Sequence, residues 1–314
     1  MPSRPCWRPT LAALLAVPAL LAPPPAPAQP VQAAAETAIA NSALDGQLLY
    51  QLLVGEIALT SGNRGTAYEW ILVAARRSGD EALFRRAVDI ALQARAGEQA
   101  LEATRAWRLA RPESLEALRV QLQILLALNR HDAIAEPLQA LLAQTPAGDR
   151  PGLIAALPRL LQRSSDPRRM AGMLDDALAP YLEDPGTRVP ARVAKGRAWL
   201  EAREPDRAWA LAQEAHALDA AAPGPALLAM ELMRARPAAE TLVRQYLDQP
   251  TAEPALRLAY VRVLTGAQRY ADAVTQLEEA TRRQPEVAAP YLSLGALQLE
   301  LKHPKEGEAA LLRY

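Results

Sequence analysis

The stretch GAQRYADAVTQLEEATRRQP, residues 266–285, has the features of the second helix of a helical hairpin. A glycine-containing turn precedes a run in which Ala273, Leu277 and Ala280 share one helical face, and Pro285 ends the run. A small residue such as Ala273 lets a neighbouring helix approach closely, because no large side chain stands between the two axes. The stretch therefore predicts a helix that crosses another helix at a small residue and is followed by a turn.

The same pattern recurs along the chain at intervals of about 34 residues. Small residues mark the successive second helices at spacings of 33, 33, 38, 37, 30, 35 and 34 residues. They are Ala67, Ala100, Ala133, Ala171, Ala208, Ala238, Ala273 and Gly307. Twelve residues before three of these positions stands a glycine in the expected first helix, namely Gly55, Gly196 and Gly295. We expect these small residues to be the packing points of stacked helix–turn–helix units.

The repeat divides residues 46–314 into eight expected units, the last of them incomplete at Tyr314. Their boundaries are 46–80, 81–113, 114–147, 148–186, 187–221, 222–251, 252–286 and 287–314. Residues 147–186 fit the pattern worst, because Pro158 falls inside the expected first helix and the unit is too long. This part is either a kinked hairpin or a joint between two sub-arrays. Residues 222–251 are too short, which suggests a clipped turn.

The composition of the 314 residues favours an all-α fold. Apolar residues make up 50% of the chain, but aromatic residues make up only 4%, with a single phenylalanine, Phe84. Abundant alanine and leucine with few β-branched or aromatic residues argue against a β-sandwich or barrel. Lysine and arginine number 35, as do aspartate and glutamate, so the formal net charge is zero. A neutral chain of this kind is a poor candidate for nucleic-acid binding.

The N-terminus has the pattern of a cleavable secretory signal. Arg4 and Arg8 precede an apolar run over residues 11–22, and Ala26 and Ala28 form a small-x-small cleavage site. The run is too short to span a bilayer, which takes about 20 apolar residues. We expect cleavage after Ala28 and export to the periplasm, with residues 29–45 as a linker.

Cys6, the only cysteine, lies before this apolar run and would be removed with the signal. A lipid-anchored exported protein needs its cysteine directly after the run, so membrane association is expected to be peripheral at most. The mature chain then has no thiol for a disulfide, a nucleophile or a metal site.

No motif for catalysis or cofactor binding is present. The three histidines, His131, His216 and His303, have no histidine or cysteine partner at helical spacing, and we expect them to face solvent or cap helices. The chain has neither a nucleophile elbow nor a glycine-rich phosphate loop with its lysine. We therefore expect no enzyme activity, no cofactor and no metal.

The unit that begins Tyr291-Leu292-Ser293-Leu294-Gly295 and continues to Gly307 and Leu311 resembles a tetratricopeptide repeat, and the resemblance covers residues 46–314. It implies a right-handed α-α superhelix whose first helices line the inner face, where other proteins or peptides bind. On the repeat phase, the charged residues of that face are Glu56, Asp89, Arg197, Glu201 and Arg262. Mixed charge among aliphatic residues suits a polypeptide partner.

Residues 48–58, so soon after an export signal, are similar to the start of exported bacterial tetratricopeptide envelope proteins, some of which are adaptors of a carboxyl-terminal processing protease. The resemblance implies a periplasmic scaffold that binds a partner protein, either an envelope protease or its substrate. The alternative is the N-terminal solenoid of a larger envelope enzyme or polysaccharide-export protein, whose working domain would lie beyond Tyr314.

Overall fold

The computed structural model describes residues 44–162 and 164–314. Backbone contacts separate the chain into two units, Met1–Ser42 and Ala43–Tyr314, and the second contains every described residue. The expected signal segment, its cleavage site at Ala26 and Ala28, and most of the linker lie outside the described residues.

The described residues form sixteen α-helices and three short 3₁₀ turns, and no strand occurs among them. The helices are α1 Gly46–Thr60, α2 Arg64–Ser78, α3 Glu81–Gln93, α4 Gly97–Ala110, α5 Leu115–Ala127, α6 Ala135–Gln144, α7 Arg150–Leu161, α8 Pro167–Leu178, α9 Arg188–Glu201, α10 Pro205–Leu218, α11 Pro223–Leu232, α12 Glu240–Leu247, α13 Pro254–Gly266, α14 Tyr270–Arg283, α15 Ala288–Glu300 and α16 Pro304–Leu311. The 3₁₀ turns are η1 His131–Ala133, η2 Ala179–Tyr181 and η3 Pro237–Ala239.

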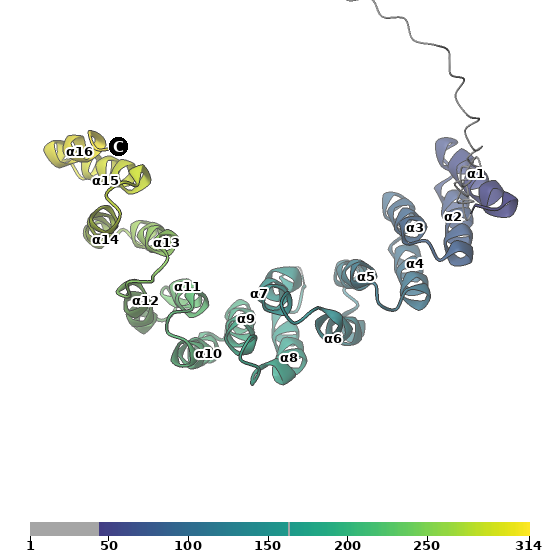
Figure 1. The fold of residues 1–314 in the computed structure, drawn as a ribbon, viewed down its shortest axis with the longest axis horizontal. Helices are drawn as coiled ribbons and strands as arrows, with labels where there is room; N and C mark the ends of the chain where they lie inside the picture. The colour runs from purple at the N-terminus through teal and green to yellow at the C-terminus, as the bar shows by residue number, and fades with distance from the viewer. Residues whose placement is uncertain (1–43, 163) are drawn as a thin grey trace, which may run out of the picture. The chain divides into compact units, whose positions relative to one another are not determined.

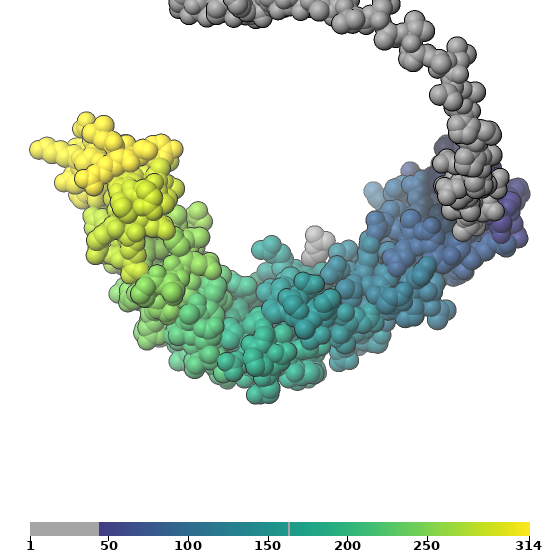
Figure 2. All heavy atoms as spheres, viewed as in Figure 1, coloured from purple at the N-terminus to yellow at the C-terminus, as the bar shows by residue number. Residues whose placement is uncertain are grey.

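With the exception of α7, each helix packs mainly against its neighbours in sequence. From α3 to α14 the odd-numbered helices lie in one layer and the even-numbered helices in the other (Figure 1). In the space-filling view the colours of the described residues follow one another in chain order without mixing (Figure 2). The predicted all-α array of helical hairpins is thus confirmed. We call the side formed by the odd-numbered helices the first-helix face.

The turn inside most hairpins contains one residue in the left-handed region. These residues have φ between 53° and 81° and precede the buried residue of the second helix by five positions. They are Gly62, Arg95, Asn129, Arg203, Gln268 and Lys302. A left-handed residue after a helix ends it, because its N–H turns back onto the last free carbonyls. Among the described residues, the α7–α8 and α11–α12 connections lack such a residue, and these belong to the two units with irregular spacing.

The hairpins cross where side chains are smallest. A Cβ atom added to Gly295 of α15 would lie 2.6 Å from Leu311 Cγ and 3.0 Å from the Gly307 carbonyl oxygen of α16. At Gly55 of α1 an added Cβ would lie 2.8 Å from a side-chain carbon of α2, and at Gly196 of α9 it would collide with one of α11. The expected alanines Ala67, Ala100, Ala208 and Ala273 are all fully buried.

Ala133 is a correction to the expected packing residues. It is exposed in η1, and Ile134 is the buried residue instead. The same displacement by one residue occurs at η3, where Ala238 is exposed and Ala239 is buried. Ile134 stands five residues after the left-handed Asn129 and 34 after Ala100, as in the regular hairpins, so Ala133 was expected one residue too early because position 134 carries a large side chain.

The irregular part around residues 147–186 is a place where the packing partner changes. Pro158 lies inside α7, as expected, and α7 makes its main helix contact with α9, whereas α7 and α8 hardly meet. Contact between α6 and the helices after it is also sparse. Polar contacts bridge this gap: His131 Nε2 lies 3.0 Å from Ser164 Oγ, and Ser165 donates to Asn129 over 3.2 Å. This arrangement is that of a joint rather than of a kinked hairpin.

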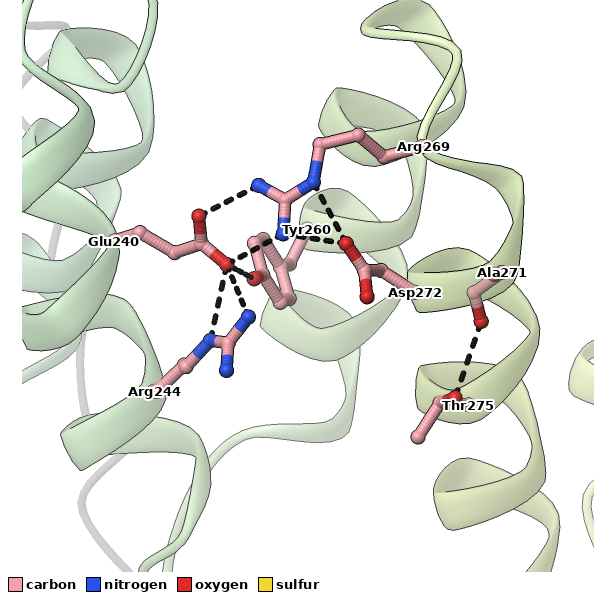
Figure 3. A network of polar contacts seen from close by, with 7 residues as sticks. All are labelled: Glu240, Arg244, Tyr260, Arg269, Ala271, Asp272 and Thr275. Carbon is pink, nitrogen blue, oxygen red and sulfur yellow. Dashed lines mark hydrogen bonds and ion pairs between the residues drawn. The ribbon is translucent and has the colours of Figure 1, made fainter.

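The short helix α12 is tied to the next hairpin by a polar network (Figure 3). The Glu240 carboxylate accepts hydrogen bonds from Arg269 at 2.6 and 2.9 Å, from the Tyr260 hydroxyl at 2.6 Å, and from Arg244 at 2.6 and 2.9 Å. Arg269 also donates to Asp272 over 2.7 Å. The hydrogen bonds from Arg269 are the main reason why the pKa of Glu240 is lowered to about 2.

Candidate protein-binding groove on the first-helix face

Two of the five charged residues expected on the first-helix face flank one arginine. Glu56 of α1 forms an ion pair with Arg86 of α3, at 2.9 Å between Oε2 and Nη2. Asp89, also on α3, lies near the same guanidinium, and both acids help to raise the pKa of Arg86, Glu56 more strongly through its hydrogen bond. Arg86 thus pairs with Glu56, and Asp89 is a second carboxylate near the same cation.

Arg197 and Glu201 lie one helical turn apart on α9 and line the same groove. Arg262 is on α13, exposed and without an ion pair among the described residues, and it does not line this groove. The five expected residues therefore occupy three separate places, and only Arg197 and Glu201 share a hollow.

The groove around α9 has a volume of about 700 Å³ and takes its walls from α7, α9 and α11. It is lined by Gly152, Ala155, Ala156, Pro158, Arg159, Gln162, Arg197, Leu200, Glu201 and Glu231. The small residues of α7 leave this space open, and a Cβ added at Gly152 would meet no atom within 4 Å. The groove exists because α7 lies against α9 with its small side chains turned outward.

A second hollow of about 390 Å³ continues the groove toward α5. Ala156 and Arg159 of α7 line both hollows. The remaining lining residues are Gln123, Leu126 and Leu160, which are apolar or uncharged. The two hollows together form one surface over four consecutive first helices, which we call the α7 groove.

Some charged side chains in the α7 groove have ion-pair or hydrogen-bond partners within the described residues, and others have none. Arg197 pairs with Glu231 of α11 at 3.2 Å, and Gln162 donates to Glu201 over 2.8 Å. Arg159, in contrast, is exposed and forms no ion pair among the described residues. The Nε atom of Arg197 is buried without a hydrogen-bond partner in the described part of the chain. Within residues 44–162 and 164–314, the α7 groove therefore offers one cation and one donor that have no partner.

Sequence reasoning missed Arg159, Gln162 and Glu231. Arg159 lies on α7 and Gln162 directly follows it, in the unit that fits the repeat worst, so the repeat phase gave no register for them. Glu231 lies in the unit that is too short, where the phase is also displaced. The small residues that precede Arg159 in α7, Gly152, Ala155 and Ala156, are the sequence feature that could have indicated a groove there.

Comparisons with known proteins add little to this description. No protein-family model matches the chain, and no curated protein is similar to it in sequence. Among solved structures, a tetratricopeptide repeat protein from Parabacteroides merdae aligns with 11% identity and a TM-score of 0.33, over 85% of this chain and 91% of that one. The architecture is recognised from the helix order and the repeated left-handed turn instead.

The fold is an all-α array of helix–turn–helix units. Helical-repeat arrays build extended surfaces from neighbouring repeats. The α7 groove is a surface of this kind, since it crosses four consecutive first helices.

The histidines of this helical array differ in their surroundings. His131 is buried against Ser164, which corrects the expectation that it faces solvent or caps a helix; the connection before α8 covers it. His303 is exposed and lies 2.9 Å from Gln298. Within residues 44–162 and 164–314, no group of three or more metal-ligating side chains is placed to hold an ion. None of the helices in that same part of the chain combines the length and apolarity that crossing a membrane requires.

Proposed function

We propose that this protein is an exported, periplasmic scaffold that binds another protein in the α7 groove and performs no chemistry of its own. The observation that carries the proposal is the exposed side chain of Arg159, which has no ion-pair partner among the described residues and lines both hollows of the groove. The secretory pattern at the N-terminus supports export.

The groove favours a particular kind of partner. A helical or extended polypeptide would place an acidic side chain opposite Arg159 and apolar side chains against Leu126 and Leu200. A polyanion is disfavoured, because Glu201 and Glu231 stand in the same wall. An envelope protease or its substrate is the first candidate, because residues 48–58 resemble the opening of exported adaptor proteins.

The test is a cross-linked capture from envelope extract with residues 29–314, in the natural form and with Arg159→Glu. We expect one stoichiometric protein to be captured by the natural form and lost with Arg159→Glu, at an unchanged melting temperature. Arg159 is the better position for charge reversal, because reversing Arg197 would leave Glu231 beside a second carboxylate.

Arg64→Glu is the matched control. Arg64 is also exposed and without an ion pair among the described residues, but it begins α2, outside the α7 groove. Capture should survive this change. Equal capture by all three forms would remove the α7 groove from the binding surface, and no specific capture by the natural form would contradict the scaffold itself.

A further inference from the structure

A second hollow lies away from the α7 groove, where the α13–α14 hairpin meets α15. Its volume is about 490 Å³, within the range of small-ligand sites. Its apolar wall includes Leu258 of α13 together with Val287 and Pro290 at the start of α15. Two guanidinium groups, Arg257 and Arg283, also line it. We call it the Arg257 pocket.

Arg257 is a buried cation without an ionic partner in the described part of the chain. Only 5% of the residue is exposed, and its guanidinium donates to two neutral acceptors, the Gln276 side-chain oxygen and the Leu247 carbonyl. Burial is the main reason why the pKa of Arg257 is lowered, and the nearby cation of Arg283 adds to it. Buried charges are normally paired, so this one is an exception that asks for an explanation.

The chain contains an internal comparison for Arg257. Arg192 stands sixteen residues before Ala208, as Arg257 stands sixteen before Ala273. Both arginines donate to the carbonyl ten residues earlier, which belongs to Leu182 for Arg192. The two side chains therefore occupy equivalent places in their hairpins.

The two equivalent arginines differ in their counter-ions. Arg192 pairs with Glu214 of α10 at 3.3 Å, and Glu214 stands six residues after Ala208. The residue six positions after Ala273 is Glu279, but it pairs with Arg282 and Arg283 instead of Arg257. The carboxylate that neutralises the first arginine is thus taken by other cations in the second hairpin, and beside the second arginine there is a pocket.

The acidic residues of the wall do not replace this counter-ion. Asp248 and Glu253 line the Arg257 pocket, but both are exposed, and neither pairs with Arg257. Their charges repel a ligand that carries several negative charges more strongly than one that carries a single charge.

We propose that the Arg257 pocket binds a monocarboxylate, with the carboxylate on Arg257 and an apolar side chain against Leu258, Val287 and Pro290. The ligand is either a free apolar acid or the C-terminal residue of a polypeptide, since both present the same group. A carboxylate there would supply to Arg257 the partner that Glu214 supplies to Arg192. The proposal is independent of the α7 groove and goes beyond the proposed scaffold function.

The probe is N-acetyl-leucine, titrated into the full chain and followed by calorimetry and by NMR shifts. A ligand of this size should bind with a dissociation constant of about a millimolar. N-acetyl-leucinamide, which has the same side chain but no charge, should bind at least tenfold more weakly. Equal binding of both compounds, or of neither, would overturn the proposal.

Variants locate the site. Arg257→Gln should abolish binding of N-acetyl-leucine, and Arg192→Gln, the change at the equivalent paired arginine, should leave it unchanged. Because Arg257→Gln could disturb the hairpin, Val287→Glu provides a second variant that places a carboxylate in the pocket without touching the arginine. It should also abolish binding, and normal affinity in Val287→Glu would place the ligand elsewhere.

A peptide separates the two sources of the carboxylate. If acetyl-Gly-Gly-Leu binds more tightly than N-acetyl-leucine, the chain recognises a polypeptide C-terminus. If it binds equally or more weakly, a free acid is the ligand. Either result requires that amidation of the leucine carboxylate removes binding.

Discussion

At Gly295 and Gly307 two helix backbones meet with no side chain between them. An added Cβ at Gly295 would be 3.0 Å from the Gly307 carbonyl oxygen, and a backbone atom cannot move aside as a side chain can. We expect Gly295→Ala to lower the free energy of unfolding by about 1–3 kcal/mol through overpacking. Urea denaturation of the full chain measures this.

Gly172→Ala is the matched control at the same scale. Gly172 lies in the middle of α8, and an added Cβ would meet no atom within 4 Å. Alanine has the better helix propensity, so this change should be neutral or should stabilise by up to about 1 kcal/mol. The same sign for both substitutions would mean that the close crossing does not limit the packing.

The residue scale is also where sequence reasoning succeeded best. Gly55, Gly196 and Gly295 were expected at helix crossings from their offsets alone, and each lies where a Cβ would collide with a neighbouring helix. The spacing between small residues predicts helix crossings because a close crossing excludes a side chain. The same spacing predicts nothing about Arg257, since an arginine at a mostly buried position does not fit any hydrophobic pattern.

At the scale of the element, the left-handed turn residue sets the end of each first helix. Gln268 has φ of 60°, a conformation that costs a residue with a Cβ about 1–2 kcal/mol. Glycine avoids this cost but loses about 0.5–1 kcal/mol through the greater freedom of its unfolded chain. We expect Gln268→Gly to stabilise the array by up to about 1 kcal/mol in thermal unfolding. Gln268→Val should do the opposite, and a stabilising valine would refute the role of the turn.

The attachment of α12 should depend on pH. The pKa of Glu240 is lowered from 4.5 to about 2, chiefly by Arg269, so the folded state favours its ionised form. This contribution is fully present above pH 4.5 and is lost as the pH falls through 2. The lowered pKa of Glu240 corresponds to a stabilisation of at most about 3 kcal/mol. Solvent screens little of this contribution, because the Glu240 side chain is only 16% exposed.

Glu240→Gln tests this attachment. We expect the natural chain to lose stability between pH 5 and pH 2 faster than the variant does, by up to about 3 kcal/mol over the interval. Thermal unfolding at several pH values measures the difference between the two proteins, in which the titration of the other acids cancels. Parallel curves would show that Glu240 does not tie α12 to the α13–α14 hairpin.

The elements show where prediction from the pattern stops. The repeat gave the helices of the regular hairpins, but it placed the buried residue at Ala133 instead of Ile134, because the search for a small residue fails where the packing position carries isoleucine. The repeat also did not predict which residues of α7 face outward, and α7 lines the α7 groove. The proposed binding surface was therefore hidden in the unit where the pattern is weakest.

At the scale of the whole molecule, sparse contact between α6 and the helices after it divides the described array. Stability in such arrays is a sum of units and their nearest-neighbour contacts. Trp107 is fully buried and stacks on Phe84 at 6.4 Å, so Trp107→Ala should cost about 3–5 kcal/mol. We expect faster amide hydrogen exchange in α1–α6 and unchanged protection in α9–α14. Loss of protection throughout would show that the joint transmits the damage.

The nearest-neighbour packing seen in Figure 2 has a mechanical consequence. When the two ends of the described array are pulled apart, the helix contacts that break lie chiefly between near neighbours in sequence, and hairpins can detach one after another. A regular unit, with the spacing of 34 residues between Ala273 and Gly307, would release roughly 110–120 Å of extended chain. The array would then lengthen in steps under load and recoil when the load is removed, so a scaffold of this kind could stay attached to its partner while the two move relative to each other.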